Sequence, residues 1–300
     1  MYLNHFKLKA LPFSITPDTG FFYQSPVHRE AMNLLLVSIA SGDGFIKLSG
    51  EVGTGKTLLC RKLLTALEAD HETAYIPNPF LNPTALRMAI ADELGLQYPR
   101  NLGQHRLLKL ITERLVELKR AGRHLVLIID EAQAMPDESL EALRLLSNLE
   151  TEQEKLLTIV LFGQPELDSK LNQPKIRQLK QRILFSYRLD ALNRFELRAY
   201  LHHRLQIAGN SDPHLFTIRA IRRLQRASSG IPRLINILGH KALMAAYGQG
   251  DKRILPRHVE RAVRDTEDAR QRLPWQRILT RLGTVAMLTG VSVFVWATTR

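Results

Sequence analysis

Eight consecutive residues, from Gly50 to Thr57, have the composition and spacing of a loop that binds phosphate. They read Gly-Glu-Val-Gly-Thr-Gly-Lys-Thr, follow an apolar run and precede a run with helical spacing. Glycines permit backbone angles closed to other residues, so consecutive N–H groups can surround an anion at the start of a helix. Lys56 would then reach the β- and γ-phosphates of a nucleotide, and the Thr57 hydroxyl would bind the Mg²⁺ between them. The alternative is an ordinary glycine turn between a strand and a helix.

A pair of acidic residues, Asp130 and Glu131, follows a second apolar run. The run Leu125–Ile129 contains five apolar residues without alternation, as in a parallel strand that is buried on both faces. At the end of such a strand Asp130 would hold Mg²⁺, and Glu131 would act as general base toward an attacking water. The alternative is a polar strand end that caps the next helix. Together with the upstream loop, the pair predicts hydrolysis of a nucleoside triphosphate. The sequence lacks the Asn-Lys-x-Asp motif that reads guanine, which favours ATP over GTP.

Two further side chains could reach the phosphates from other parts of the chain. Gln164 follows a third apolar run, Leu156–Phe162, and the alternative role for it is that of an ordinary turn residue. Arg233 stands at a predicted helix start, where the helix dipole disfavours a cation unless it faces an anion. The alternative for Arg233 is a solvated surface position. The predicted cofactor-binding residues are Gly50, Gly53, Thr54, Gly55, Lys56, Thr57, Leu58 and Arg233, the metal ligands are Thr57 and Asp130, and the catalytic residues include Glu131 and Gln164.

Alternating strands and helices must position these residues. The apolar runs predict strands over 45–49, 73–76, 125–129, 156–162 and 183–189. Helical spacing fills the intervals over 27–41, 55–69, 82–94, 102–120, 137–149 and 166–171. This alternation is typical of an α/β fold with a doubly wound parallel sheet that is covered on both faces. Ligands bind such sheets at the carboxyl ends of the strands, where the motifs lie.

From Asn193 onward the pattern is wholly helical. Helices are predicted near 193–208, 217–228, 232–247 and 256–267, and they form a small lid-like domain. The first 26 residues are irregular but rich in aromatic side chains, so we expect them to pack on the body. The predicted organisation is an N-terminal segment (1–26), an α/β domain (27–190), a helical domain (191–268), a basic linker (269–281) and a terminal apolar segment (282–299).

Charge separates the two halves of the chain, whose net charge is +13. Residues 1–169 contain 17 Lys and Arg against 21 Asp and Glu, whereas residues 170–281 contain 24 against 8. A basic module of this kind can attract nucleic acid or anionic lipid, and charge alone does not decide between them. The single cysteine, Cys60, excludes an internal disulfide framework, and no His and Cys cluster has the spacing of a zinc site.

The uncharged segment 282–299 is eighteen residues long. As a helix it would measure roughly 27 Å, just enough for a bilayer core of about 30 Å. Four arginines shortly before it (270, 272, 277 and 281) and only Arg300 after it place the body in the cytoplasm by the positive-inside rule. We therefore expect a transmembrane helix in the inner membrane. The alternative is a terminal helix buried in this protein or in a partner.

The motifs as a set resemble those of a known family. They are G-E-V-G-T-G-K-T, L-V-L-I-I-D-E-A-Q, F-G-Q-P-E-L, Q-R-I and G-I-P-R-L-I-N, preceded by P-F-S-I-T-P-D and H-R-E-A-M-N-L-L-L. The combination, over about residues 1–270, is similar to the AAA+ ATPases of bacterial secretion and pilus assembly. This is the general-secretion A-type (ExeA/GspA-like) family, with its members that serve MSHA-type type IV pili.

The resemblance implies a P-loop AAA+ fold with a helical lid, and Mg²⁺-dependent ATP hydrolysis in a homo-oligomer. It assigns Gln164 as sensor 1 and Arg233 as sensor 2. It also implies an arginine finger supplied to the neighbouring subunit, for which Arg182 is the first choice and Arg177 the reserve. The secretion members continue past the membrane segment into a peptidoglycan-binding region, whereas this sequence stops at Arg300, so we do not expect direct binding to the cell wall.

Three functions follow as hypotheses. The first is a membrane-associated ATPase that drives assembly of a type IV pilus or a related secretion machine, with inner-membrane assembly proteins and an anionic lipid surface as partners. The second is an AAA+ DNA-targeting ATPase of the transposition type, which would bind nucleic acid through the basic helical domain. The third is an adaptor that binds ATP but hydrolyses it too slowly to matter.

Overall fold

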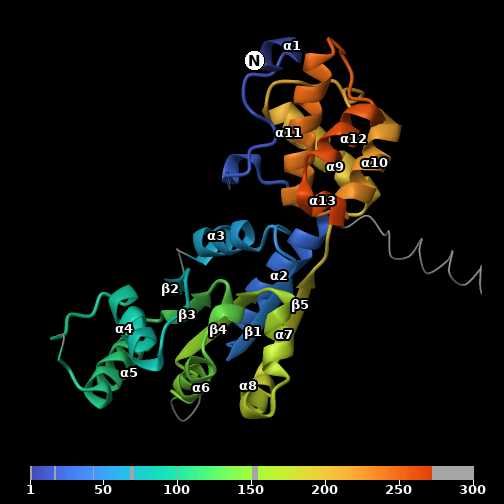
Figure 1. Ribbon diagram of the computed structural model, residues 1–300. Coiled ribbons are helices and arrows are strands. Elements are labelled where there is room, and N and C mark those ends of the chain that lie inside the picture. The colour runs from blue at the N-terminus through green and yellow to red at the C-terminus, as the bar shows by residue number, and fades with distance from the viewer. Residues whose placement is uncertain are drawn as a thin grey trace, which may run out of the picture.

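Five parallel strands form the sheet of the α/β domain within the described residues, in the order β2-β3-β4-β1-β5 (Figure 1). The computed structural model describes residues 2–16, 18–42, 44–67, 71–99, 101–150 and 155–271. The strands are β1 (Phe45–Gly50), β2 (His71–Ile76), β3 (His124–Ile129), β4 (Leu157–Gly163) and β5 (Ile183–Leu189). The predicted α/β fold with a parallel sheet is confirmed, and β2 begins two residues earlier than the sequence indicated.

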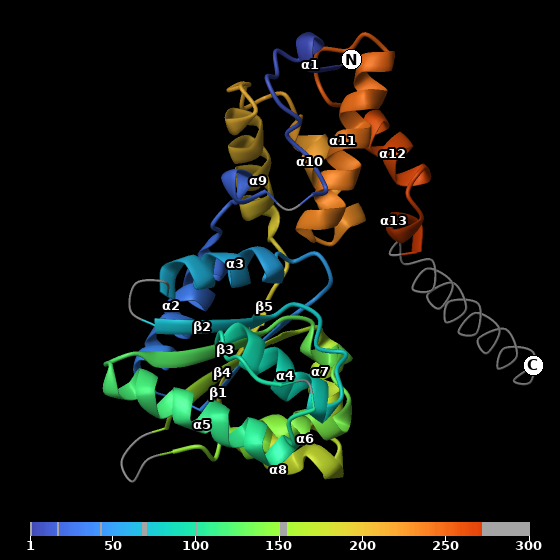
Figure 2. The same cartoon turned by 90° about the vertical axis from the view of Figure 1, so that its left-hand side faces the viewer.

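Helices cover both faces of this sheet (Figure 2). They are α2 (Pro26–Ala40), α3 (Lys56–Leu67), α4 (Pro83–Glu93), α5 (Gln104–Arg120), α6 (Asp137–Leu146), α7 (Pro165–Leu171) and α8 (Arg177–Lys180). Alternate residues of β3 enter opposite layers: Leu127 packs with α4, α5 and α6, whereas Val126 and Ile128 pack with α2 and α3. A strand buried on both faces has no polar position except at its end, which is why Asp130 and Glu131 follow the carboxyl end of β3.

Two caps that the sequence indicated fix where helices begin. The Asn82 side chain accepts a hydrogen bond from the N–H of Ala85, and Pro83 occupies the first position of α4. Asn193 and Glu196 form a reciprocal capping box at the start of α9 (Arg194–Ile207). Because β5 ends at Leu189, only a short connection separates the last strand from this helix.

The helical domain has its own core and includes the N-terminal segment. Its helices are α9, α10 (Ile218–Ser228), α11 (Pro232–Gly248), α12 (Pro256–Arg264) and α13 (Glu267–Gln271), and the short α1 (Tyr2–His5) and η1 (Thr19–Phe21) pack with them (Figures 1 and 2). Phe13 is 1% exposed and stacks edge-on against Phe216. The Tyr2 hydroxyl is 2.9 Å from Nδ1 of His240. The first residues of the chain therefore complete the hydrophobic core of its last domain.

The predicted basic linker (269–281) lies outside the described residues beyond Gln271, and the predicted membrane segment (282–299) lies outside them entirely. Among the residues that the structure does describe, no helix combines the length and the apolar character needed to cross a bilayer.

Candidate active site

Two glycines allow the loop from Gly50 to Thr57, predicted to bind phosphate, to lie close to its surroundings. The loop connects β1 to α3, and Gly53 and Gly55 adopt φ values of +82° and +103°, which side-chain-bearing residues rarely adopt. A Cβ atom on Gly53 would lie 2.5 Å from Cβ of Arg233, and one on Gly55 would lie 3.0 Å from Nε2 of His28. Both glycines are therefore required by backbone angle and by space.

Lys56 is buried in the loop and is 5% exposed. Its ammonium group donates hydrogen bonds to the carbonyl oxygens of Gly50 (2.7 Å) and Glu51 (3.0 Å). Burial lowers the pKa of Lys56, and the nearby carboxylates of Glu131 and Asp130 oppose that effect. A cation that is held out of water in a glycine-rich loop is suited to binding phosphate.

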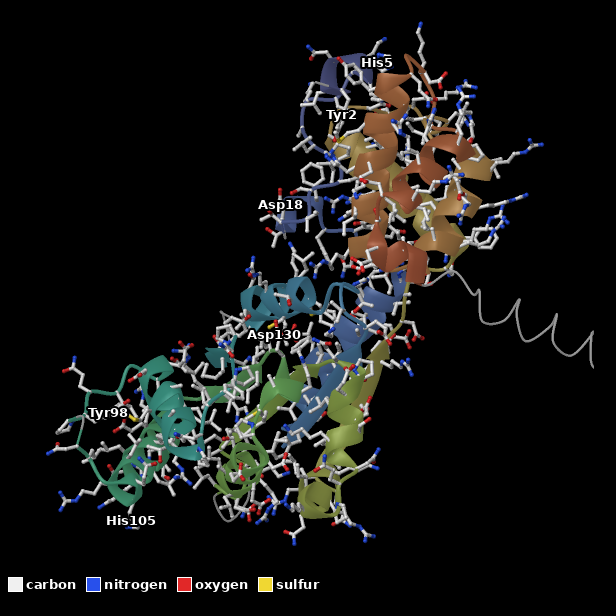
Figure 3. All side chains as sticks on the ribbon, viewed as in Figure 1. Tyr2, His5, Asp18, Tyr98, His105 and Asp130 are labelled. Carbon is white, nitrogen blue, oxygen red and sulfur yellow. The ribbon has the colours of Figure 1, made fainter. Side chains whose placement is uncertain are left out.

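Thr57 and Asp130 meet at the end of the sheet. The Thr57 hydroxyl donates to a carboxylate oxygen of Asp130 at 2.9 Å, and the other oxygen accepts from the N–H of Glu131 at 2.9 Å. Asp130 is 3% exposed, and this burial raises its pKa. Figure 3 shows Asp130 on the side of the α/β domain that faces the helical domain. Mg²⁺ prefers a few protein oxygen ligands together with phosphate and water, so this hydroxyl and carboxylate fit the ion.

Glu131 belongs to a network of side chains from two strand ends. It adopts a left-handed conformation (φ 52°) immediately before the turn η2 (Ala132–Ala134). The amide nitrogens of Gln133 and Gln164 both donate to the same carboxylate oxygen of Glu131, the latter at 2.8 Å. Roles for Glu131 and Gln164 were predicted from the sequence, whereas Gln133, the last residue of the motif L-V-L-I-I-D-E-A-Q, was assigned none.

One cavity of about 400 Å³ collects most of the predicted site. Its walls include Gly53, Gly55, Lys56, Thr57, Leu58, Glu131 and Arg233. Four predicted residues adjoin the cavity without lining it. Gly50 is the last residue of β1, and Thr54 is part of the loop. Asp130 is hydrogen-bonded to Thr57, and Gln164 is hydrogen-bonded to Glu131.

The helical domain and the N-terminal segment close the other side of this cavity. The Arg233 N–H donates to the Gly53 carbonyl at 3.1 Å, which brings the first turn of α11 against the loop. Ser14, Tyr200 and Arg204 also line the cavity. Arg204 is 6% exposed and lies 5.1 Å from the centre of the Phe21 ring. No pattern in the sequence indicated that α9 and the first residues of the chain meet here.

The two arginine-finger candidates lie away from this cavity. Arg182 donates to the hydroxyl of Ser147 at 2.8 Å and to the carbonyl of Arg144 at 3.3 Å, both at the end of α6 in the same chain. Arg177 is exposed at the start of α8, and its side chain has no hydrogen bond or ion pair to any residue that the structure describes. Neither side chain belongs to the cavity of its own chain.

His28, a second residue that the sequence did not single out, supports the loop from α2. Its Nε2 lies 3.1 Å from the Thr54 carbonyl and its Nδ1 lies 2.7 Å from the Ser25 hydroxyl. The carbonyl can only accept a hydrogen bond, so Nε2 carries the proton and Nδ1 accepts from Ser25. Burial lowers the pKa of His28, which agrees with this neutral form.

The lowered pKa of His28 predicts a loss of stability in mild acid. Above about pH 6.5 the side chain is neutral in both the folded and the unfolded chain. Below that pH the unfolded chain binds a proton that the folded chain takes up only at lower pH, so stability falls by about 1.4 kcal/mol per unit of pKa difference. In thermal melts between pH 7.5 and 5.5, His28→Gln should lose less melting temperature than the wild type. Equal losses in both proteins would contradict the assignment.

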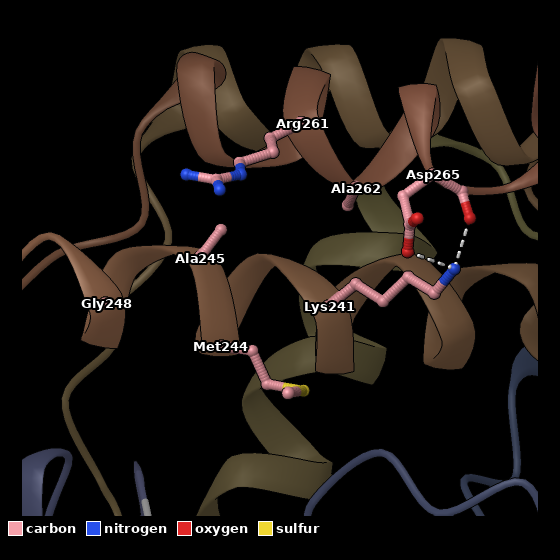
Figure 4. Close-up of a pocket in the computed structure, with 7 residues that line it drawn as sticks. All are labelled: Lys241, Met244, Ala245, Gly248, Arg261, Ala262 and Asp265. Carbon is pink, nitrogen blue, oxygen red and sulfur yellow. Dashed lines mark hydrogen bonds and ion pairs between the residues drawn. The ribbon is translucent and has the colours of Figure 1, made fainter.

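A second hollow, of about 440 Å³, lies between α11 and α12 (Figure 4). Lys241 forms an ion pair with Asp265 at 2.8 Å on its wall, and Met244 and Arg261 also line it. None of the predicted site residues belongs to it, so it is separate from the phosphate-binding loop.

Known proteins match one segment of the chain and also nearly its whole length. Residues 39–171 match the protein family described as AAA domain. Over 296 residues, 99% of its length, the chain is 42% identical to the general secretion pathway protein A of Aeromonas hydrophila, of which it covers 54%. The chain thus spans about half the length of this relative.

Solved structures share the fold. Cdc6p from Pyrobaculum aerophilum has a TM-score of 0.62 at 20% identity, over 83% of this chain and 71% of that one. The Aeropyrum pernix ORC1 protein, solved in complex with DNA, has a TM-score of 0.60 at 19% identity, over 85% of this chain and 69% of that one. Likeness at these identities shows the fold alone.

Proposed function

The chain belongs to the AAA-domain proteins of the general secretion pathway protein A type, and on this premise we propose that it binds ATP with Mg²⁺ and hydrolyses the γ-phosphate. One observation carries the proposal: a single cavity is lined by Lys56, Thr57, Glu131 and Arg233. Phosphate binding, metal binding, water activation and charge stabilisation thereby converge on one space, which is what phosphoryl transfer requires.

Each residue then has a distinct task. The loop N–H groups and Lys56 bind the phosphates, and Thr57 with Asp130 would hold Mg²⁺, which would supply positive charge to offset that of the phosphates. Glu131 accepts the proton of the attacking water. Gln164 orients that water or the γ-phosphate from the end of β4. Arg233 belongs to the helical domain and contacts the phosphates, so it couples nucleotide binding to the position of that domain.

The active assembly that we propose is a homo-oligomer. Neither Arg182 nor Arg177 reaches the cavity of its own chain, so a finger from either must act on a neighbouring subunit. Arg182 remains the first choice, and it would have to exchange its hydrogen bond to Ser147 for a phosphate. The exposed Arg177 is the reserve.

We propose that the ATPase serves a type IV pilus of the MSHA type or a related secretion apparatus of the inner membrane. Support comes from the identity to the general secretion pathway protein A over nearly the whole chain. In a bacterium that lacks the chromosomal gene, surface pili or secreted protein should be lost and should return with wild-type protein but not with Lys56→Ala. Normal assembly without the gene would remove this part of the proposal.

The ATPase body is proposed to sit on the cytoplasmic face, anchored through residues 282–299. Full-length protein should then sediment with membranes and resist extraction by high salt, because a segment of eighteen uncharged residues is held by apolar burial. Protein truncated after Arg281 should be released by salt. Identical soluble behaviour of both proteins would contradict the anchor.

The exposed arginines of α10 give this body a basic surface, which we assign to anionic lipid. Arg219, Arg222 and Arg226 are exposed and have no ion pair within the described part of the chain. Each cation near an anionic leaflet contributes about 1 kcal/mol. Duplex DNA is the competing partner, and steeply salt-dependent DNA binding by the truncated protein, without binding to anionic vesicles, would favour the DNA-targeting function.

A further inference from the structure

The carboxylate of Glu131 is held by side chains, because its backbone alone does not fix it. Glu131 lies at a left-handed junction (φ 52°) between β3 and the three-residue turn η2. The two hydrogen bonds that its side chain accepts from described residues arrive at one oxygen, from Gln133 and from Gln164. The direction in which the second oxygen points is therefore set by these two amides.

Gln133 contacts the backbone of Gln164 as well as the carboxylate of Glu131. While its amide nitrogen donates to Glu131, its amide oxygen accepts the backbone N–H of Gln164 at 2.9 Å. The orientation of the amide is forced, because a carboxylate needs a donor and a backbone N–H needs an acceptor. The end of β3 and the end of β4 are thus joined through one side chain.

The surroundings accommodate this bridge and hold its turn in place. A Cβ atom on Gly163 would lie 3.3 Å from the Gln133 amide oxygen and 2.6 Å from the Leu167 side chain, so a glycine there leaves the approach open. Lys170 on α7 donates to the backbone carbonyl of Gln133 at 3.4 Å and also to that of Met135. The turn that carries Gln133 is therefore tied to α7 as well as to β3.

We propose that Gln133 is the positioning residue for ATP hydrolysis: it aims the Glu131 carboxylate at the attacking water and keeps Gln164 in register with it. The proposal rests on the proposed hydrolysis at this site. Only a side chain with a donor and an acceptor at this length can serve both partners. Glutamate keeps the acceptor for Gln164 but places an oxygen against Glu131, and leucine offers neither group.

The test is a comparison of full-length wild type, Gln133→Leu and Gln133→Glu, with Gln206→Glu on the exposed side of α9 as the matched control. Gln133→Leu should lower kcat about 10- to 100-fold, since a general base displaced by about 1 Å loses about that much. Its affinity for an ATP analogue should stay within about twofold, because the phosphate-binding loop is untouched. Gln206→Glu should match the wild type.

A background that lacks the general base gives a readout that a loss of packing would not change. Gln133→Glu keeps the acceptor for Gln164 but loses the donor to Glu131, so it should lower kcat as Gln133→Leu does while KM stays within about twofold. A Gln133→Glu variant with the kcat of the wild type would contradict the contact. In a Glu131→Gln background, Gln133→Leu should cause no further loss, and a further tenfold loss would show that Gln133 acts on another group.

Failure of this inference is distinguishable from failure of the proposed function. A wild type that does not release phosphate from ATP overturns the proposed hydrolysis itself. A wild type that hydrolyses ATP alongside a Gln133→Leu variant of equal kcat overturns only the role of Gln133.

Discussion

Glu131→Gln is expected to lower kcat for ATP hydrolysis by about 10²- to 10⁴-fold, the usual contribution of a positioned general base. The amide has almost the same shape as the carboxylate but cannot accept the proton of the attacking water. Affinity for ATP should stay within about twofold, because Lys56 and Thr57 bind the phosphates independently of Glu131. Steady-state phosphate release and equilibrium binding of a fluorescent ATP analogue separate the two effects.

The matched control for this substitution is Glu113→Gln, which also removes one negative charge. Glu113 is exposed on α5, a helix that does not line the cavity, and its ion pair with Lys109 is long, at 3.8 Å. This variant should keep the kcat of the wild type. Undiminished turnover in Glu131→Gln would defeat the assignment of the base.

Lys56→Ala is expected to weaken ATP binding by about 10²- to 10⁴-fold. The ammonium group already lies among the loop carbonyls, and charge-assisted hydrogen bonds to two phosphates contribute roughly 1.5–3 kcal/mol each. Titration with the fluorescent analogue measures the loss directly. Hydrolysis at low ATP should fall by at least the same factor.

Lys62→Ala controls for the loss of one cation from the same helix. Lys62 lies on α3 as Lys56 does, but its side chain is exposed to solvent. It should bind ATP as the wild type does. If Lys56→Ala bound ATP as tightly as Lys62→Ala, the phosphates would have to bind elsewhere.

The sequence predicted the parts of the site that depend on local pattern. The run before Asp130 is uniformly apolar because β3 is buried between two helical layers, so its position and the polarity of its end could both be inferred. The loop at Gly53 and Gly55 could be inferred because glycine is required there by positive φ angles. Arg233 could be inferred because a cation at a helix start needs an anion nearby.

Contacts between distant parts of the chain were beyond such reasoning. The aromatic residues near the N-terminus indicated packing, but their partners lie some two hundred positions later: the Asn210 side chain donates to the Phe6 carbonyl at 2.5 Å. No periodicity encodes that pairing. Gln133 was missed for a related reason, since its importance lies in reaching Gln164, which follows another strand.

The identity of the arginine finger could not be inferred for a different reason. The resemblance to a family implied Arg182, and the structure of one chain places this side chain against Ser147 of the same chain. Whether Arg182 or Arg177 completes a neighbouring site depends on the surface that a second subunit presents. Each arginine can be replaced by alanine and the variant mixed with Glu131→Gln protein, which supplies an intact arginine in trans. The finger is the arginine whose alanine variant is inactive alone but regains turnover in the mixture.

The most direct test of the central claim, that this chain hydrolyses ATP at the loop between Gly50 and Thr57, is phosphate release from ATP by the full-length protein with Mg²⁺ and after chelation of the metal. We predict steady release that stops with EDTA, resumes when Mg²⁺ is restored, and is absent from Lys56→Ala under the same conditions. Release that persists in EDTA, or equally in Lys56→Ala, would contradict the account.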